Sequence, residues 1–189
     1  MKAKLLTLTL AMAMVFGVSA FAEESATETA AETAAETTAE TAADTAEEGT
    51  TAETVTITSL NASGEEIELE VPYDPQRIAI LDMACLDILD NLGVGDRVVG
   101  SASTSLDYLQ DYVTNEEIEN LGTIKEADME AVMACEPDVI FIGGRLSSSY
   151  DALSEIAPVV YLSTDTEIGV VESVRKNAST IASMFGLED

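Results

Sequence analysis

Residues 120–145 constrain the fold of this chain more than any other segment, because they join a helical pattern, an apolar run and two basic residues. From residue 129 to 135, Met, Val and Cys recur at the spacing of one helical face, with Asp128 as N-cap and Pro137 as the stop. Val139–Ile142 follows without a polar residue, which is typical of a strand covered on both faces of a parallel sheet. The segment therefore predicts a helix that leads into a buried parallel strand.

The chain from residue 55 to 189 repeats this alternation, and we expect it to form one domain. Residues 55–60 and 66–71 alternate polar with apolar side chains around a turn, which predicts a β-hairpin at an edge. Apolar runs predict strands at 78–81, 98–99, 139–142 and 159–162, and helical patterns fall at 84–92, 105–119, 128–135 and 147–156. The alternation predicts an α/β fold with helices flanking a parallel sheet. A final helix is predicted from a stripe that would face the core, namely Ile168, Val171, Val174, Ala178, Ile181 and Phe185.

The N-terminus has the pattern of an export signal. Two lysines precede an apolar segment at 5–18, and Ala20-Phe21-Ala22 supplies the small residues that signal peptidase requires. We expect residues 1–22 to be removed as a signal peptide, with an uncleaved anchor as the alternative. No cysteine lies near the cleavage site to carry a lipid. The predicted location is the periplasm or the outer face of the cell envelope.

Residues 23–54 are almost entirely Ala, Glu and Thr and carry ten acids. Their acids would stack on neighbouring turns of a helix, and no large apolar residue offsets the cost of ordering, so we expect a disordered acidic spacer. Removal of the signal peptide takes the formal charge from −28 to −30. The residues from 55 onward hold 26 acids and 6 bases, which excludes a nucleic-acid partner because phosphate binding needs a basic surface.

The reactive residue types argue against catalysis. The chain has no histidine, no GxSxG motif and no phosphate-binding loop, so we expect neither an enzyme nor a metal site. Cys85 begins one predicted helix and Cys135 lies on the apolar face of another. We expect two buried, unpaired thiols, and a disulfide is the alternative that an exported protein permits.

The few basic residues divide according to their strands, because ligands of parallel sheets bind beyond the carboxyl ends of the strands. Arg77 and Arg97 precede strands and belong at the opposite edge, on solvated surface or in ion pairs. Arg145 directly follows its strand, and Lys125 follows the short segment 121–124. We expect these two cations at the ligand edge, together with Asp82, Ser101, Ser103 and Ser163.

Several separated motifs occur in the order found in one family of transport proteins. They are PQRIAILD at 75–82, LGTIKE at 121–126, EPDVI at 136–140 and GGR at 143–145, preceded by the signal peptide and the hairpin. With them the chain resembles siderophore-binding proteins of ABC importers, in particular the ferric catecholate and petrobactin-type members. The resemblance implies the Rossmann-like N-terminal lobe of a class III periplasmic binding protein. In this family the ligand lies between two lobes. The chain resembles the first lobe only, so we expect it to be truncated after that lobe.

The resemblance also implies roles for individual residues. Lys125 and Arg145 match basic residues that contact the ligand, and charges of this kind suit the anionic oxygens of a ferric siderophore. Tyr150 is placed either to stack on an aromatic arm of the ligand or to pack in the core. Glu130 matches the acidic knob that related proteins present to the membrane permease. Without these roles, Arg145 would pair with a carboxylate, and Lys125 and Glu130 would be solvated.

The function implied is that of a monomeric binding protein, which captures an anionic ferric siderophore and delivers it to an ABC importer permease without a cofactor of its own. Another chelate is the alternative ligand, such as haem, a corrinoid or a hydroxamate siderophore. A single-lobe fragment that binds nothing is the second alternative. The pair of cations favours an anionic chelate, since neutral or cationic ferric hydroxamates need them less.

Overall fold

The computed structural model describes residues 53–188, so the predicted signal peptide and spacer residues 23–52 lie outside the described residues. The described residues belong to one compact unit, Glu48–Asp189. Strands β1 (Thr54–Leu60) and β2 (Glu66–Pro72) form an antiparallel hairpin with its own two-stranded sheet. The predicted hairpin is confirmed, although its first strand begins at Thr54, the last residue assigned to the spacer.

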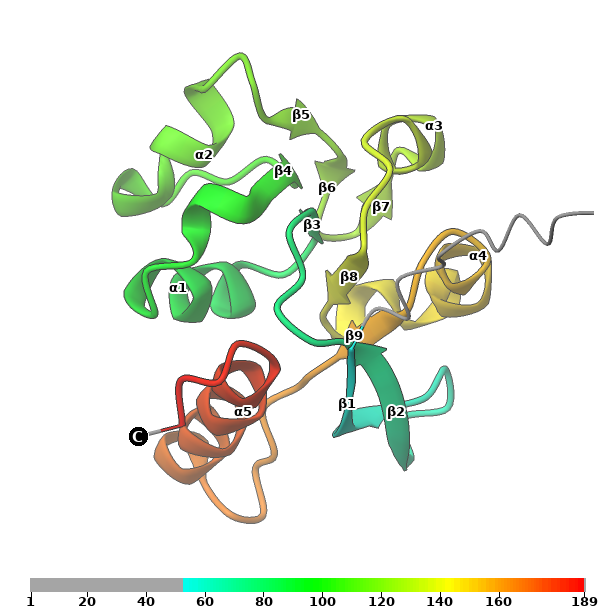
Figure 1. The fold of residues 1–189 in the computed structure, drawn as a ribbon, viewed down its shortest axis with the longest axis vertical. Helices are drawn as coiled ribbons and strands as arrows, with labels where there is room; N and C mark the ends of the chain where they lie inside the picture. Colours follow the sequence, from blue (N-terminus) through cyan, green and yellow to red (C-terminus); the bar gives the residue numbers. More distant parts are fainter. Residues whose placement is uncertain (1–52, 189) are drawn as a thin grey trace, which may run out of the picture. The chain divides into compact units, whose positions relative to one another are not determined.

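The main sheet has five parallel strands, as the α/β pattern predicted (Figure 1). They are β3 (Ile78–Ile80), β4 (Val98–Ser101), β5 (Glu119–Asn120), β8 (Val139–Ile142) and β9 (Val159–Tyr161), in the order β5-β4-β3-β8-β9. Every residue of β3, β8 and β9 is buried. The chain runs outward from β3 to β5 and then returns to place β8 on the other side of β3, so the strand order reverses between β3 and β8.

Helices cover both faces of this sheet. Helices α1 (Met83–Asn91) and α5 (Val170–Met184) lie with the hairpin on one face, and α3 (Met129–Ala134) and α4 (Tyr150–Ser154) lie on the other (Figure 1). Alternate strand residues supply the two cores, with Ile78 and Ile80 on the α1 side and Ala79 on the α3 side. Cys85 and Cys135 belong to opposite cores, and both are buried and free, as predicted.

The segment at 105–119 does not form the single helix that was predicted. It contains a 3-10 turn, η2 (Asp107–Leu109), and the short helix α2 (Asp111–Thr114). Asn115 ends the helix because its side-chain oxygen accepts a hydrogen bond from the Glu117 amide at 3.0 Å, an alternative to helical pairing. Two further short turns are η1 (Gly95–Arg97) and η3 (Gly144–Ser149), and β6 (Gly122–Thr123) pairs with β7 (Glu126–Ala127) in a small hairpin.

The predicted stripe of the last helix is correct only in its second half. Ile181 and Phe185 are buried, but Val171 is 74% exposed, Val174 is 44% exposed and Ile168 precedes the helix. Ser173 takes the buried position of the first turn, where its hydroxyl accepts a hydrogen bond from the Asp165 amide at 2.7 Å. The helix therefore packs by its C-terminal half and by a polar contact near its start, which apolar periodicity does not reveal.

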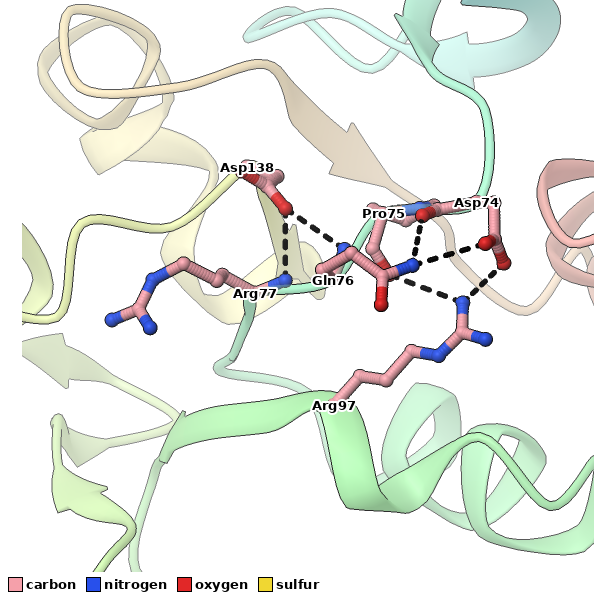
Figure 2. A network of polar contacts seen from close by, with 6 residues as sticks. All are labelled: Asp74, Pro75, Gln76, Arg77, Arg97 and Asp138. Atoms are coloured by element: carbon pink, nitrogen blue, oxygen red, sulfur yellow. Dashed lines mark hydrogen bonds and ion pairs between the residues drawn. The ribbon is translucent and has the colours of Figure 1, made fainter. Parts of the chain in front are cut away.

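A polar network holds the amino-terminal ends of the central strands (Figure 2). The Asp138 carboxylate, just before β8, accepts hydrogen bonds from the backbone amides of Gln76 and Arg77, just before β3, at 2.8 and 2.9 Å. Arg97, just before β4, pairs with Asp74 and lies 5.4 Å from the centre of the Phe185 ring. Arg97 thus forms the ion pair expected for a cation at this edge.

The network predicts that Asp138 is a stability determinant. Asp138→Ala removes a carboxylate that accepts two backbone hydrogen bonds, and we expect a loss of about 2 kcal/mol in the free energy of unfolding. Asp138→Asn keeps one acceptor oxygen and should lose less. Urea unfolding followed by circular dichroism measures both, with exposed Asp151→Ala as a control that should change stability by less than about 0.5 kcal/mol. Equal stability of Asp138→Ala and the wild type would contradict this role.

Candidate functional site

A hollow of about 420 Å³ opens at the carboxyl ends of β3, β8 and β9. It lies where the strand order reverses between β3 and β8, the position at which open α/β sheets bind ligands. Its walls come from α1, η3, the tip of the β6–β7 hairpin, the segment after β9, and α5. The lining residues are Asp82, Ala84, Cys85, Asp87, Ile88, Ile124, Gly143, Gly144, Arg145, Leu162, Ser163, Thr164, Val174 and Asn177.

Asp82 lies at the centre of the strand reversal and has a structural task there. One carboxylate oxygen caps α1 by accepting hydrogen bonds from the amides of Ala84 and Cys85, both at 3.0 Å. Gly143 follows β8 directly, and a Cβ atom at this position would overlap the other carboxylate oxygen of Asp82. The backbone at Gly143 is extended, so contact with Asp82, rather than backbone conformation, excludes a larger residue.

Cys85 lines the hollow but remains a thiol. Burial raises its pKa well above the ordinary value, and the charge and hydrogen bond of Asp82 raise it further. A protonated thiol is a poor nucleophile and a poor metal ligand. Cys85 therefore contributes apolar surface to the hollow.

Arg145 lines the hollow as predicted. It is the second residue of η3, and the next residue, Leu146, is fully buried in the core and anchors the turn. The side chain of Arg145 is exposed and forms no ion pair with any residue in 53–188. The alternative in which Arg145 pairs with a carboxylate is thus not seen within the described part of the chain.

Lys125 lies beside the hollow, at the tip of the β6–β7 hairpin. The Thr123 hydroxyl accepts hydrogen bonds from the amides of Lys125 and Glu126, at 3.2 and 3.1 Å, which tightens the turn. The preceding residue, Ile124, lines the hollow, whereas Lys125 itself is exposed next to it. Within residues 53–188, Lys125 has no ion-pair partner.

The other four cations of residues 53–188 are engaged within the fold. Arg77 donates hydrogen bonds to the carbonyl oxygens of Cys135 and Glu136 after α3, and Arg97 pairs with Asp74. Arg175 pairs with Glu172, and Lys176 pairs with Glu66. Lys125 and Arg145 are therefore the cations left available to a ligand, and both lie at the predicted edge.

The remaining predicted site residues do not gather in one place. Ser163 lines the hollow, where its carbonyl oxygen accepts a hydrogen bond from the Asn177 amide at 3.2 Å. Ser103 lies outside the lining and its hydroxyl donates to the Gly122 carbonyl oxygen at 2.7 Å, whereas Ser101 is buried. Tyr150 begins α4 and packs against the core on the α3 side, also outside the lining. Its position agrees with the core alternative for this residue.

Sequence reasoning did not identify three polar residues of the hollow, namely Asp87, Thr164 and Asn177. Asp87 follows Ala84 by three residues, so both lie on the same face of α1, and this spacing was the available signal. Asn177 lies on α5 one turn after Ser173, and both hold the segment after β9 through the Ser163 carbonyl oxygen. Nothing in the sequence shows that this segment turns back onto α5.

Two further possibilities concern metal ions and membranes. Within residues 53–188, no group of three or more Cys, Asp or Glu side chains is placed to hold a metal ion. None of the helices in this range has the length and apolar character needed to span a membrane.

Comparison with known proteins agrees with the observed fold. The family model described as "Periplasmic binding protein" matches residues 78–189, and the chain belongs to this family. It is 34% identical over 141 residues to the petrobactin-binding protein YclQ of Bacillus subtilis, which is 74% of this chain and 43% of YclQ. It is also 34% identical over 92 residues to the ferric-anguibactin-binding protein FatB of Vibrio anguillarum, covering 48% of this chain and 28% of FatB.

Solved structures of two binding proteins share the fold of this chain. The crystal structure of YclQ superimposes with a TM-score of 0.65 and 33% identity, over 72% of this chain and 47% of YclQ. The catecholate-siderophore binding protein VctP of Vibrio cholerae gives a TM-score of 0.62 and 29% identity, over 71% and 47% of the two chains. The predicted Rossmann-like lobe of a periplasmic binding protein is confirmed. The chain spans less than half the length of these relatives.

The contact between Gly143 and Asp82 gives a test of the site's construction. Gly143→Ala should lower the free energy of unfolding by about 1 to 3 kcal/mol, because the new methyl group displaces a carboxylate that caps α1. Gly144→Ala is the matched control, since its Cβ would lie 3.3 Å from the Tyr161 hydroxyl and needs only a small shift. In an Asp82→Ala background the cost of Gly143→Ala should fall, and additive effects in this double-mutant cycle would refute the contact.

Proposed function

We propose that this chain is a solute-binding component of an iron-siderophore ABC importer and captures an anionic ferric siderophore at the hollow beyond β3 and β8. The observation that carries the proposal is the state of the basic residues. Four of the six cations in residues 53–188 are engaged by ion pairs or hydrogen bonds within the fold, and the two whose side chains have neither, Arg145 and Lys125, lie at the ligand edge. A surface with 26 acids from residue 55 onward otherwise repels anions.

The chemistry of these two cations supports an anionic chelate. The planar guanidinium of Arg145 can donate paired hydrogen bonds to two oxygens of one ligand, and the Lys125 ammonium adds a flexible point charge. Ile88, Ile124 and Val174 supply apolar surface in the same lining for the carbon skeleton of the ligand. The named ligands of YclQ, FatB and VctP are consistent with this class. The proposal is therefore capture and release rather than catalysis.

In this proposal the described residues form one wall of a binding cleft. We take residues 55–189 to correspond to the first lobe of the longer relatives, of which this chain spans less than half the length. A second lobe would add the opposite wall and further ligand contacts. Binding to the single wall is then expected to be weak, so the measurement must detect low affinity.

In this proposal the protein delivers its ligand to a permease at the outer face of the cytoplasmic membrane. Glu130 is our candidate for contact with that permease. It lies in the first turn of α3, where its amide donates to the capping Asp128 carboxylate at 3.1 Å. Its side chain is exposed and has no ion-pair partner within residues 53–188. An exposed, unpaired carboxylate at a helix start can present its charge to an arginine of another protein.

Arg145→Ala tests the ligand site. We expect the affinity for a ferric tris-catecholate to fall by about tenfold or more, because a hydrogen bond to a charged group contributes roughly 1.5 to 3 kcal/mol. Equilibrium dialysis, with the iron complex followed by its visible absorption, measures the dissociation constants. Arg175→Ala removes an exposed, paired arginine of α5 and is the matched control.

The outcomes separate the alternative readings of the chain. Unchanged affinity in Arg145→Ala would remove Arg145 from the site. Tighter binding of a neutral ferric hydroxamate than of the tris-catecholate would favour the alternative class of ligand. If no complex binds, the result would favour the alternative in which this chain is a single-lobe fragment that binds nothing.

Glu130→Lys tests the docking proposal. The dissociation constant for the ferric complex should stay within about twofold of the wild type, because Glu130 lies outside the hollow. Uptake of radioactive iron by cells that depend on this protein should fall strongly, since the reversed charge would repel a basic pocket. Glu116→Lys, at another exposed acid, controls for the change in net charge. Normal uptake in Glu130→Lys would end the docking proposal.

A further inference from the structure

The hollow contains an unpaired negative charge as well as an unpaired positive one. Its charged lining residues are Asp82, Asp87 and Arg145. The Asp82 carboxylate is occupied by two backbone amides and by its contact with Gly143. The Asp87 carboxylate has a weaker partner, the Asn91 side-chain amide at 3.3 Å, and no ion pair within residues 53–188.

Helix α1 places Asp87 on one wall of the hollow. The residue lies in the second turn of α1 and is half-buried, next to the lining residues Ala84 and Ile88. The opposite face of the helix is fixed by Leu86 and Leu89, which are fully buried. The backbone of Asp87 is therefore fixed beside the hollow.

Asp87 and Arg145 line one cavity from different elements, and they do not pair with each other. A ligand that is anionic over its whole surface would be attracted by Arg145 and repelled by Asp87. A ligand with anionic oxygens on one side and a cationic or N–H donor group on the other would satisfy both residues. Charge complementarity thus predicts where the charged groups of the ligand lie, as well as the sign of its net charge.

We propose that Asp87 is a specificity-determining residue of the hollow, and that it selects metal chelates that carry a protonated amine or another N–H donor beside their anionic oxygens. The inference rests on the proposed function, since it assumes that the hollow binds a chelate. In this proposal Arg145 on η3 donates hydrogen bonds to the metal-binding oxygens of the chelate. Asp87 on α1 accepts a hydrogen bond from the N–H donor group of the chelate.

The test compares two ferric tris-catecholates that differ by one group per arm. One is made with 4-ethylcatechol and the other with dopamine, which carries an ammonium at the end of the same two-carbon chain. Equilibrium dialysis with the chain gives a dissociation constant for each complex, at a pH that keeps the iron fully tris-coordinated. We expect the dopamine complex to bind more tightly, and Asp87→Asn to reduce this preference by about tenfold.

The acidic surface as a whole also favours the less negative dopamine complex, so a control variant is required. Asp151→Asn makes the same change in charge on exposed α4, outside the hollow, and should leave the preference within about twofold of the wild type. Thermal melts check that each variant is folded. Asp87→Ser replaces Asp87→Asn if the latter does not fold.

The results distinguish failure of this inference from failure of the proposed function. If both complexes bind and Asp87→Asn keeps the wild-type preference, Asp87 does not select the ligand and the proposed function stands. An equal loss of preference in Asp151→Asn would also overturn the role of Asp87, because the effect would then belong to the net charge. If neither complex binds to the wild type, the proposed function fails and this inference fails with it.

Discussion

The Asp138 carboxylate is the interaction on which the geometry of the site depends. It joins the starts of β3 and β8 through two backbone amides, and β3 pairs with β8 in register from Ile78 and Val139 onward. These two strands are neighbours in the sheet but are separated in the chain by the excursion to β4 and β5. Fixing their amino-terminal ends also fixes where their carboxyl ends stop, and the crevice at those ends is the hollow.

At the carboxyl edge of the sheet, Asp82 has a structural role like that of Asp138 at the amino-terminal edge. It caps α1 and fits against a residue without a side chain, so the start of the helix and the end of β8 approach closely. Helix α1 places Asp87 in one wall of the hollow, and the η3 turn after Gly143 places Arg145 in another. Asp138 thus joins the strands at the amino-terminal edge of the sheet, and Asp82 shapes the hollow at the carboxyl edge.

Much of this arrangement could be predicted from the sequence where local and tertiary signals agree. The run Val139–Ile142 is buried as its composition requires, and the rule for parallel strands correctly separated Arg97 from Arg145. The predictions failed where packing is polar or the contact is remote in sequence. Ser173 occupies a buried position that apolar periodicity assigned to other residues, and Asn115 ends a helix through its own side chain. Asp87 carries no motif, because its significance depends on a cavity built from five separate segments.

The placement of the two thiols on opposite sides of the sheet has a consequence for folding in an oxidising environment. Cys85 and Cys135 belong to different cores, so the native fold requires no disulfide and gains nothing from an oxidant. Each thiol is almost fully shielded from solvent, so its reaction with an alkylating reagent should become faster when its own layer opens. The chain therefore carries a natural pair of reporters, one for each face, that can reveal whether the two layers of the fold open together or one at a time.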